Sequence, residues 1–285
     1  MKLQSMLVVL ILANTISILA QSNSYQSEKL KKIWVTEGLS VPESVLPVYE
    51  KGILYVSNIG TNNPNEKENN GFISILGTDG SIKNLKWCSN LNSPKGMATY
   101  DGFLYVTEVN KVSKIDIKTG AKVSSVPVKG AIFLNDIAVD TQGTLYVTDS
   151  RTGTIHKIKN DSVNVLIKSD NFPNPNGIIT ANDKVVAGTG TNVISVNSGT
   201  TEVNECLSNT GAVDGLVMIE PGVFLFSNWP GKIYLMKKGG GKELLLDTSS
   251  LETSQTADFG YISDTKRIYV PTFFGNSIVC YELND

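Results

Sequence analysis

The sequence has little of several residue types on which common protein activities depend. Among 285 residues it contains one histidine, His156, and two arginines, Arg151 and Arg267. The basic residues are scattered and the net charge is −2. Nucleic-acid binders gather Lys and Arg on one face, so this composition excludes a nucleic acid as a partner. The scarcity of arginine also leaves no bidentate clamp for a substrate carboxylate.

The three cysteines are too far apart in the sequence to form a short metal-binding motif. Cys88, Cys206 and Cys280 make no CxxC pair, which argues against a structural zinc site or a redox motif. In an oxidising compartment one pair could form a disulfide and leave one thiol. The sequence does not decide which pair that would be.

Long apolar runs are absent beyond the first twenty residues. A short basic start precedes an apolar run from Leu7 to Leu19, which Asn14 and Thr15 interrupt. The run is shorter than the roughly 20 residues that a membrane span needs, and small residues follow it. This pattern predicts a signal peptide over residues 1–20, cleaved near Ala20, in a secreted or periplasmic protein with no membrane contact beyond export. A retained N-terminal anchor is the alternative.

A phrase of about forty residues recurs along the rest of the chain. It begins with a small polar or charged residue, often followed by Gly, and continues with an apolar alternation, a turn and a strand of the Leu-Tyr-Val-Thr type. Successive copies are separated by 52, 40, 41, 38 and 44 residues. The key residues of the six copies are Glu43, Lys95, Asn135, Asn176, Asp214 and Asp258.

In the recurring strands apolar residues alternate with period two. The strands are rich in β-branched and aromatic residues, as in 53–57, 103–107 and 145–148. Such segments suit a pleated, half-buried surface, and three or four of them per repeat make one propeller blade. No convincing amphipathic helix accompanies them. The sequence therefore predicts an all-β fold, a single six-bladed β-propeller over residues 21–285. The polar run 62–70 is expected to be a loop at the mouth of the site, and 277–283 to close the ring with 32–36.

The repeat predicts a ring of polar side chains, because the innermost strand of each blade runs along the channel. Carboxylate and amide oxygens are the ligands that Ca²⁺ prefers, and Glu43, Asn135, Asn176 and Asp214 supply them. Lys95 and Asp258 complete the predicted ring. Zinc is disfavoured because no thiolate belongs to the ring, and His156 is interpreted as an ordinary strand residue.

At these residues the sequence resembles a known family. Segments 133–140 with 143–149, 175–178 and 213–216 are similar to the Asn-Asp, Asn-Gly and Asp-Gly blade motifs of the senescence marker protein, gluconolactonase and regucalcin family. Paraoxonases and diisopropyl fluorophosphatase are more distant. The resemblance implies a divalent cation, usually calcium, held by Glu43, Asn135, Asn176 and Asp214, with Asp214 also the catalytic base. It implies hydrolysis of a lactone or related ester as the activity, with a small-molecule substrate.

Two features depart from that pattern. Lys95 occupies a ring position, where its ammonium would repel a dication, so the alternative is that Lys95 replaces the metal and pairs with the carboxylates. No histidine is available for a paraoxonase-like mechanism. A non-catalytic NHL-like propeller that binds a ligand or protein is the competing function, and a metal-free strictosidine-synthase-like member is a third.

Aromatic residues one strand-length beyond the ring have two interpretations. Trp229 and Phe273 either form apolar walls of a pocket or, as the preferred interpretation, pack between blades. Asp149 and Asn228 are interpreted as turn-capping residues.

Overall fold

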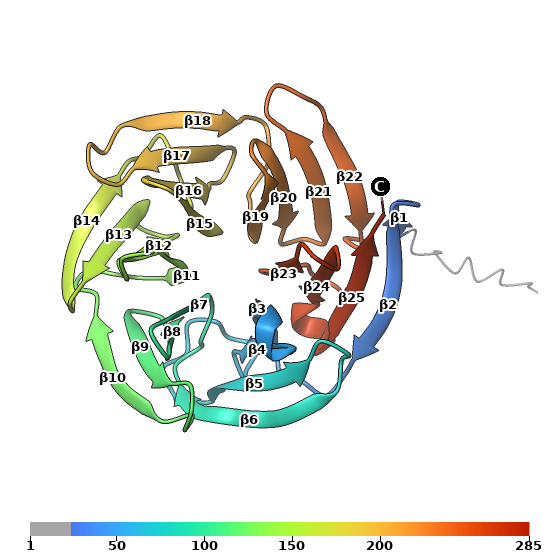
Figure 1. Ribbon diagram of the computed structural model, residues 1–285, viewed down its shortest axis with the longest axis horizontal. Helices are drawn as coiled ribbons and strands as arrows, with labels where there is room; N and C mark the ends of the chain where they lie inside the picture. The colour runs from blue at the N-terminus through green and yellow to red at the C-terminus, as the bar shows by residue number, and fades with distance from the viewer. Residues whose placement is uncertain (1–23, 285) are drawn as a thin grey trace, which may run out of the picture.

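The protein is built almost entirely of β-strands. The computed structural model describes residues 24–284 and contains two short 3₁₀ turns, η1 (Tyr49–Lys51) and η2 (Phe273–Gly275). Six sheets are arranged around a central channel (Figure 1), which confirms the predicted six-bladed propeller. Among the described residues, no helix is long and apolar enough to cross a membrane. The predicted signal peptide at 1–20 lies outside the described residues.

Each blade has four antiparallel strands, the first of which borders the channel, and one of the six sheets gains a fifth strand at its outer edge. The first blade contains β3 (Pro42–Val48), β4 (Ile53–Asn58), β5 (Gly71–Gly77) and β6 (Ile82–Leu91). The second contains β7 (Met97–Tyr100), β8 (Phe103–Thr107), β9 (Lys111–Asp116) and β10 (Lys122–Pro127). The third contains β11 (Leu134–Val139), β12 (Leu145–Asp149), β13 (Thr154–Lys159) and β14 (Ser162–Lys168). The fourth contains β15 (Ile178–Ala181), β16 (Lys184–Gly188), β17 (Val193–Asn197) and β18 (Val203–Leu207). The fifth contains β19 (Leu216–Glu220), β20 (Val223–Asn228), β21 (Lys232–Lys237) and β22 (Lys242–Asp247).

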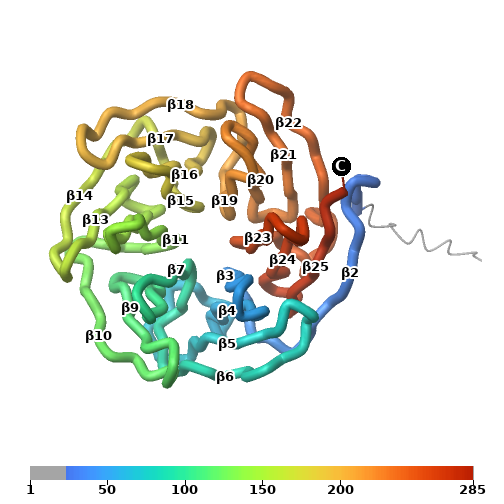
Figure 2. Tube along the Cα trace, in the orientation of Figure 1, coloured from blue at the N-terminus to red at the C-terminus, as the bar shows by residue number. Residues whose placement is uncertain are grey.

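The sixth blade combines strands from near both ends of the described residues. Its inner strands are β23 (Gly260–Ile262), β24 (Arg267–Pro271) and β25 (Ile278–Leu283), and its outer strand is β2 (Leu30–Thr36). Because β2 pairs with β25, the ring closes as the sequence predicted. A preceding strand, β1 (Tyr25–Gln26), pairs with β22. The N-terminal segment therefore ties the fifth and sixth blades together (Figure 2).

The apolar core lies between neighbouring blades. Leu54 and Val56 of the first blade, for example, pack with Tyr269, Ile278 and Cys280 of the sixth. Burying such side chains stabilises each blade against the next by about 1.5–3 kcal/mol per large residue. The three cysteines are free thiols.

The long connection from β4 to β5 contains the inserted polar loop. Its residues fold against the start of the second blade, where the backbone N–H of Asn69 donates to Asn92 Oδ1 (3.1 Å) and Ser93 Oγ donates to the carbonyl of Glu66 (3.0 Å). Pro64 of this loop borders the pocket described next. The loop therefore lies at the mouth of the site, as expected.

Candidate functional site

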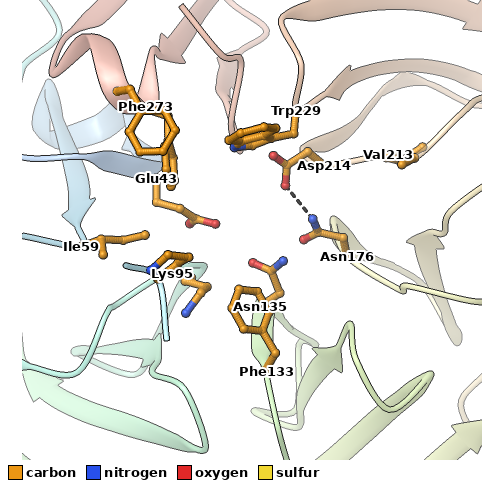
Figure 3. A pocket seen from close by; sticks show the side chains of 13 residues that line it. Glu43, Ile59, Lys95, Phe133, Asn135, Asn176, Val213, Asp214, Trp229 and Phe273 are labelled. Atoms are coloured by element: carbon orange, nitrogen blue, oxygen red, sulfur yellow. Dashed lines mark hydrogen bonds between the residues drawn. The ribbon is translucent and has the colours of Figure 1, made fainter. Parts of the chain in front are cut away.

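A pocket of about 380 Å³ occupies one end of the central channel. Five of the six predicted ring residues line it (Figure 3), namely Glu43, Lys95, Asn135, Asn176 and Asp214. Two of them lie in the inner strands β3 and β11, and the other three lie two residues before β7, β15 and β19. Five different blades therefore each contribute one polar side chain to the same space.

Backbone hydrogen bonds between blades place these residues at one level. At alternate junctions between blades, the N–H that follows a ring residue donates to the ring carbonyl of the next blade, as from Gly96 to Asn135 (3.0 Å) and from Gly177 to Asp214 (2.8 Å). The same bond runs from the N–H of Asp258 to the carbonyl of Glu43 (3.0 Å). Asp258 therefore occupies the same position in its repeat as Gly96 and Gly177 do in theirs, one residue after the ring position.

The sixth ring position is therefore Ala257, and Asp258 lies one residue beyond the predicted ring. The N–H of Ala257 donates to the β24 carbonyl of Pro271, just as the N–H of Asp214 donates to the β20 carbonyl of Ser227. A shift of one residue along an extended chain turns a side chain to the opposite side. The alanine leaves the sixth side of the pocket without a polar group.

Asp258 belongs to a second polar level further along the inner strands. Its Oδ2 accepts a hydrogen bond from Ser44 Oγ (2.5 Å), and Asp136 Oδ2 accepts one from the N–H of Ile178 (2.8 Å). Both carboxyl groups border a second cavity of the channel. Burial raises the pKa of Asp136 to about 7 and raises that of Asp258 well above its ordinary value.

Polar residues at the end of the second strand of a blade form hydrogen bonds to the loops that line the pocket. Asp149 accepts hydrogen bonds from the N–H groups of Ile132 (2.9 Å) and Phe133 (3.1 Å). Glu108 does the same for the N–H of Asn92 (2.6 Å) in the second blade. These carboxylates act as loop caps, as interpreted for Asp149, and Asp149 fixes the aromatic residue Phe133 at the pocket.

Lys95 is the one cation among the side chains that line the pocket, and it is 1% exposed. Its ammonium donates to the carbonyl of Ser93 (3.0 Å) and lies 4.5 Å from the centre of the Phe133 ring. No carboxylate oxygen of the described residues lies within ion-pair distance of it. Burial lowers the pKa of Lys95 to about 8, although the charges of Glu43 and Glu108 act in the opposite direction.

The two carboxyl groups of the pocket lie in different environments. Asp214 Oδ1 accepts a hydrogen bond from Asn176 Nδ2 at 2.6 Å. Burial raises the pKa of Asp214 to about 7 against the opposing effect of that hydrogen bond. Glu43 Oε2 is buried without a hydrogen-bond partner among the described residues, and burial, followed by the charge of Asp214, raises the pKa of Glu43 well above its ordinary value.

The remaining walls of the pocket are apolar. They are formed mainly by Ile59, Pro64, Phe133, Trp229, Phe273 and Phe274. Trp229 and Phe273 therefore line the pocket, where blade packing had been the preferred interpretation. Phe273 also packs with Ile59, so it serves both purposes. Asn228, next to the tryptophan, donates through Nδ2 to the carbonyl of Ala212 (2.6 Å), which holds the neighbouring loop.

The donor set of the pocket is poor in carboxylates and imidazoles. Within residues 24–284, no group of three His, Cys, Asp or Glu side chains is placed to hold a metal ion. The pocket instead combines two carboxylates with two amides. His156 lies in β13, buried, and is absent from the lining of the pocket.

Comparisons with known proteins identify the fold. No family model matches the sequence, and no curated protein matches it. Among solved structures, virginiamycin B lyase from Staphylococcus aureus is 14% identical with a TM-score of 0.62, covering 92% of this chain and 100% of that one. A putative gluconolactonase is 13% identical with a TM-score of 0.63, covering 90% and 92%. A chain of a nidogen–laminin complex is 15% identical with a TM-score of 0.59, covering 85% and 88%.

Sequence reasoning did not assign Ile59, Pro64 and Phe133 to the pocket and gave the pocket as the less favoured interpretation of Trp229 and Phe273, although the repeat contains a signal for most of them. Ile59, Trp229 and Phe273 each follow the end of the second strand of their blade. Phe133 lies two residues before the ring position of the third blade. Aligning these two positions across the repeats would have placed the apolar residues around the same axis as the polar ring.

Proposed function

We propose that this protein is a divalent-cation-dependent hydrolase, with Ca²⁺ as the expected cation, acting on a lactone or related ester. The observation that carries the proposal is the convergence of four oxygen-bearing side chains, Glu43, Asn135, Asn176 and Asp214, on one end of the channel. The gluconolactonase-like fold supports it.

The residues fit a hard cation by their chemistry. Asn135 and Asn176 use their amide nitrogens on Ser150 Oγ (3.2 Å) and on Asp214, which leaves both amide oxygens as acceptors. Glu43 has a buried carboxylate oxygen that forms no hydrogen bond with any residue that the structure describes. Burying such groups is unfavourable unless they are paired or coordinate a metal, and Ca²⁺ accepts carboxylate and amide oxygens in irregular geometry.

The side chains divide the work of hydrolysis. A bound Ca²⁺ would polarise the substrate carbonyl and stabilise the negative charge that develops on its oxygen. Asp214 is the candidate general base, which takes a proton from water as the water oxygen attacks the carbonyl carbon. The bond from that carbon to the ester oxygen then breaks, and the leaving oxygen takes the proton back. Asn176 orients the Asp214 carboxylate through its hydrogen bond.

The pocket gives less support to the other candidate functions. One solved lyase with this fold is described as inactive after a histidine-to-alanine substitution, whereas the single histidine of this chain lies outside the pocket. A binding propeller remains the alternative function, since the fold is also found in the nidogen–laminin complex. For that function the pocket would need no cation.

Calorimetric titration of the purified protein with Ca²⁺ tests the proposal. We expect one-to-one binding that Asp214→Ala abolishes, because the variant removes one of two anionic ligands. The control Asp183→Ala removes an exposed carboxylate in the turn between β15 and β16 and should leave binding unchanged. A panel of lactones, assayed by acid release with and without a chelator, then measures hydrolysis.

Cation binding with chelator-sensitive hydrolysis that is lost in Asp214→Ala would support the hydrolase. Absence of cation binding in the unmodified protein, together with no hydrolysis of any lactone, would overturn it and favour the binding propeller.

A further inference from the structure

We infer that the substrate of this pocket carries an apolar alkyl or aryl group beside its reacting carbonyl, and that Trp229, Phe273 and Phe274 hold that group. The inference rests on the proposed function and names its substrate class. It follows from how the pocket is divided between polar and apolar side chains (Figure 3).

The polar groups of the pocket are confined to the ring. Beyond them the lining side chains offer one hydrogen-bonding group, the indole N–H of Trp229. A polyhydroxylated lactone would bring several hydroxyl groups against this wall, and a buried hydroxyl without a partner is unfavourable. Burying a hydrocarbon group against the same wall would be favourable, because both surfaces are apolar. The pocket therefore discriminates against a sugar lactone.

The aromatic wall is a defined cluster of three rings. Phe273 and Phe274 meet edge to face with centroids 4.8 Å apart, and Trp229 lies edge-on to them at 5.7 and 6.2 Å. Aromatic rings in this arrangement stabilise one another, so the wall is preformed. Trp229 is nevertheless 41% exposed. A large apolar side chain left partly bare at the mouth of a pocket marks a surface for an apolar ligand.

Phe273 has an energetically unfavourable backbone conformation at this position in the pocket wall. Its φ is +46°, in the left-handed region that bulky residues avoid. Conformations of this kind persist where surrounding contacts enforce them, and they cluster at ligand sites. Here Asn276 fixes the turn, because its Oδ1 accepts a hydrogen bond from the N–H of Val41 at 2.7 Å. The strained turn directs the ring into the pocket.

Ile59 and Pro64 extend the apolar lining from the first blade and its inserted loop. An apolar group that leaves the ring of polar residues toward the mouth would therefore contact the first, fifth and sixth blades together. This arrangement places the reacting carbonyl at the polar floor and the hydrocarbon at the outer wall.

Binding of lactams, which resist hydrolysis, tests the inference separately from catalysis. The probes are γ-lactams with a propyl, pentyl or heptyl chain, and gluconolactam as the polyhydroxylated comparison. Calorimetry should show affinity rising by up to about fourfold per added methylene group, with gluconolactam the weakest ligand. Trp229→Ala and Phe274→Ala should flatten this dependence. Tyr49→Ala, which removes a comparably exposed aromatic ring outside the pocket, should not.

A dependence on chain length that Trp229→Ala flattens and Tyr49→Ala preserves would support the inference. Equal affinity for all chain lengths, or tighter binding of gluconolactam, would overturn it even if lactones are hydrolysed. Length-dependent binding without hydrolysis of any alkyl lactone would support the apolar ligand class and count against the hydrolase, so the two failures are distinguishable.

Discussion

Gly96 packs directly against Asp136 of the neighbouring blade. A Cβ atom on Gly96 would lie 2.2 Å from Asp136 Oδ1 and 2.6 Å from its Cα. Because the obstacle includes backbone, it cannot rotate away. The absence of a side chain at this position allows the second and third blades to approach each other directly below the pocket.

Replacing Gly96 by alanine should therefore destabilise the protein by about 1–3 kcal/mol, the usual result of overpacking a tight contact. Urea unfolding followed by circular dichroism measures the change. Gly241→Ala is the matched control, since nothing lies within 4 Å of a Cβ there. Equal stability of the two variants would show that the blades do not pack as described.

Lys95 provides a second prediction, because its buried ammonium shares the pocket with the proposed cation site. A unit charge and a dication several ångströms apart repel each other by several kcal/mol even at an effective dielectric constant near 20. Lys95→Met keeps the length of the side chain and removes the charge. Calorimetry should show Ca²⁺ affinity increased by about tenfold or more. Unchanged or weaker Ca²⁺ binding would indicate that Lys95 itself supplies the positive charge of the pocket.

A third prediction concerns closure of the ring. A chain that starts at residue 37 lacks β2, which leaves β25 unpaired on one side and removes the buried Leu30. We expect it to lose cooperative unfolding. A chain that starts at residue 28 lacks only β1, whose two residues pair with β22, and should keep a single transition. Thermal unfolding of both chains provides the measurement, and a cooperative transition in the shorter one would contradict the role given to β2.

The single histidine gives a fourth prediction. Burial lowers the pKa of His156 below its ordinary value of about 6.5. The unfolded chain therefore binds this proton more readily, so the stability that neutral His156 contributes is present above about pH 6.5 and is lost as the pH falls through the folded-state pKa.

Nuclear magnetic resonance can follow this imidazole without assignment, because the sequence has no other histidine. We expect its titration midpoint below 6.5, and we expect His156→Leu to be less sensitive to acid than the unmodified protein between pH 7 and pH 5. A midpoint at or above 6.5 would contradict the prediction.

The repeat of about forty residues in the sequence was enough to predict the blades and the closure of the ring. Each repeat must bury its faces against its neighbours, and this requirement produces a pattern that recurs in the sequence. The ring was harder to place. In five blades the polar residue stands at the position that lines the pocket, whereas in the sixth the phrase Asp258-Phe259-Gly260 resembles a ring motif one residue out of register.

Only the hydrogen bonds between blades assign that position to Ala257. The sequence shows the aromatic residues of the wall one by one, but the conformations of the loops decide whether their side chains come together. Trp229 and Phe273 lie in different blades and are 44 positions apart in the sequence. Nothing in the period predicts the left-handed turn at Phe273 that aims its ring at the pocket.

The pocket contains side chains of the first and the sixth blades, and the sixth is the blade that closes the ring. Glu43 belongs to the first blade and Phe273 to the sixth, which is complete only when β25 pairs with β2. A growing chain has made every ring residue once residue 257 exists, yet it still lacks the aromatic turn and the last strand. Until β25 has been made, β2 lacks its partner strand and presents an open edge to other chains. The order of synthesis thus places the aromatic wall after the polar ring, and a chain that stops before Phe273 lacks the assembled pocket.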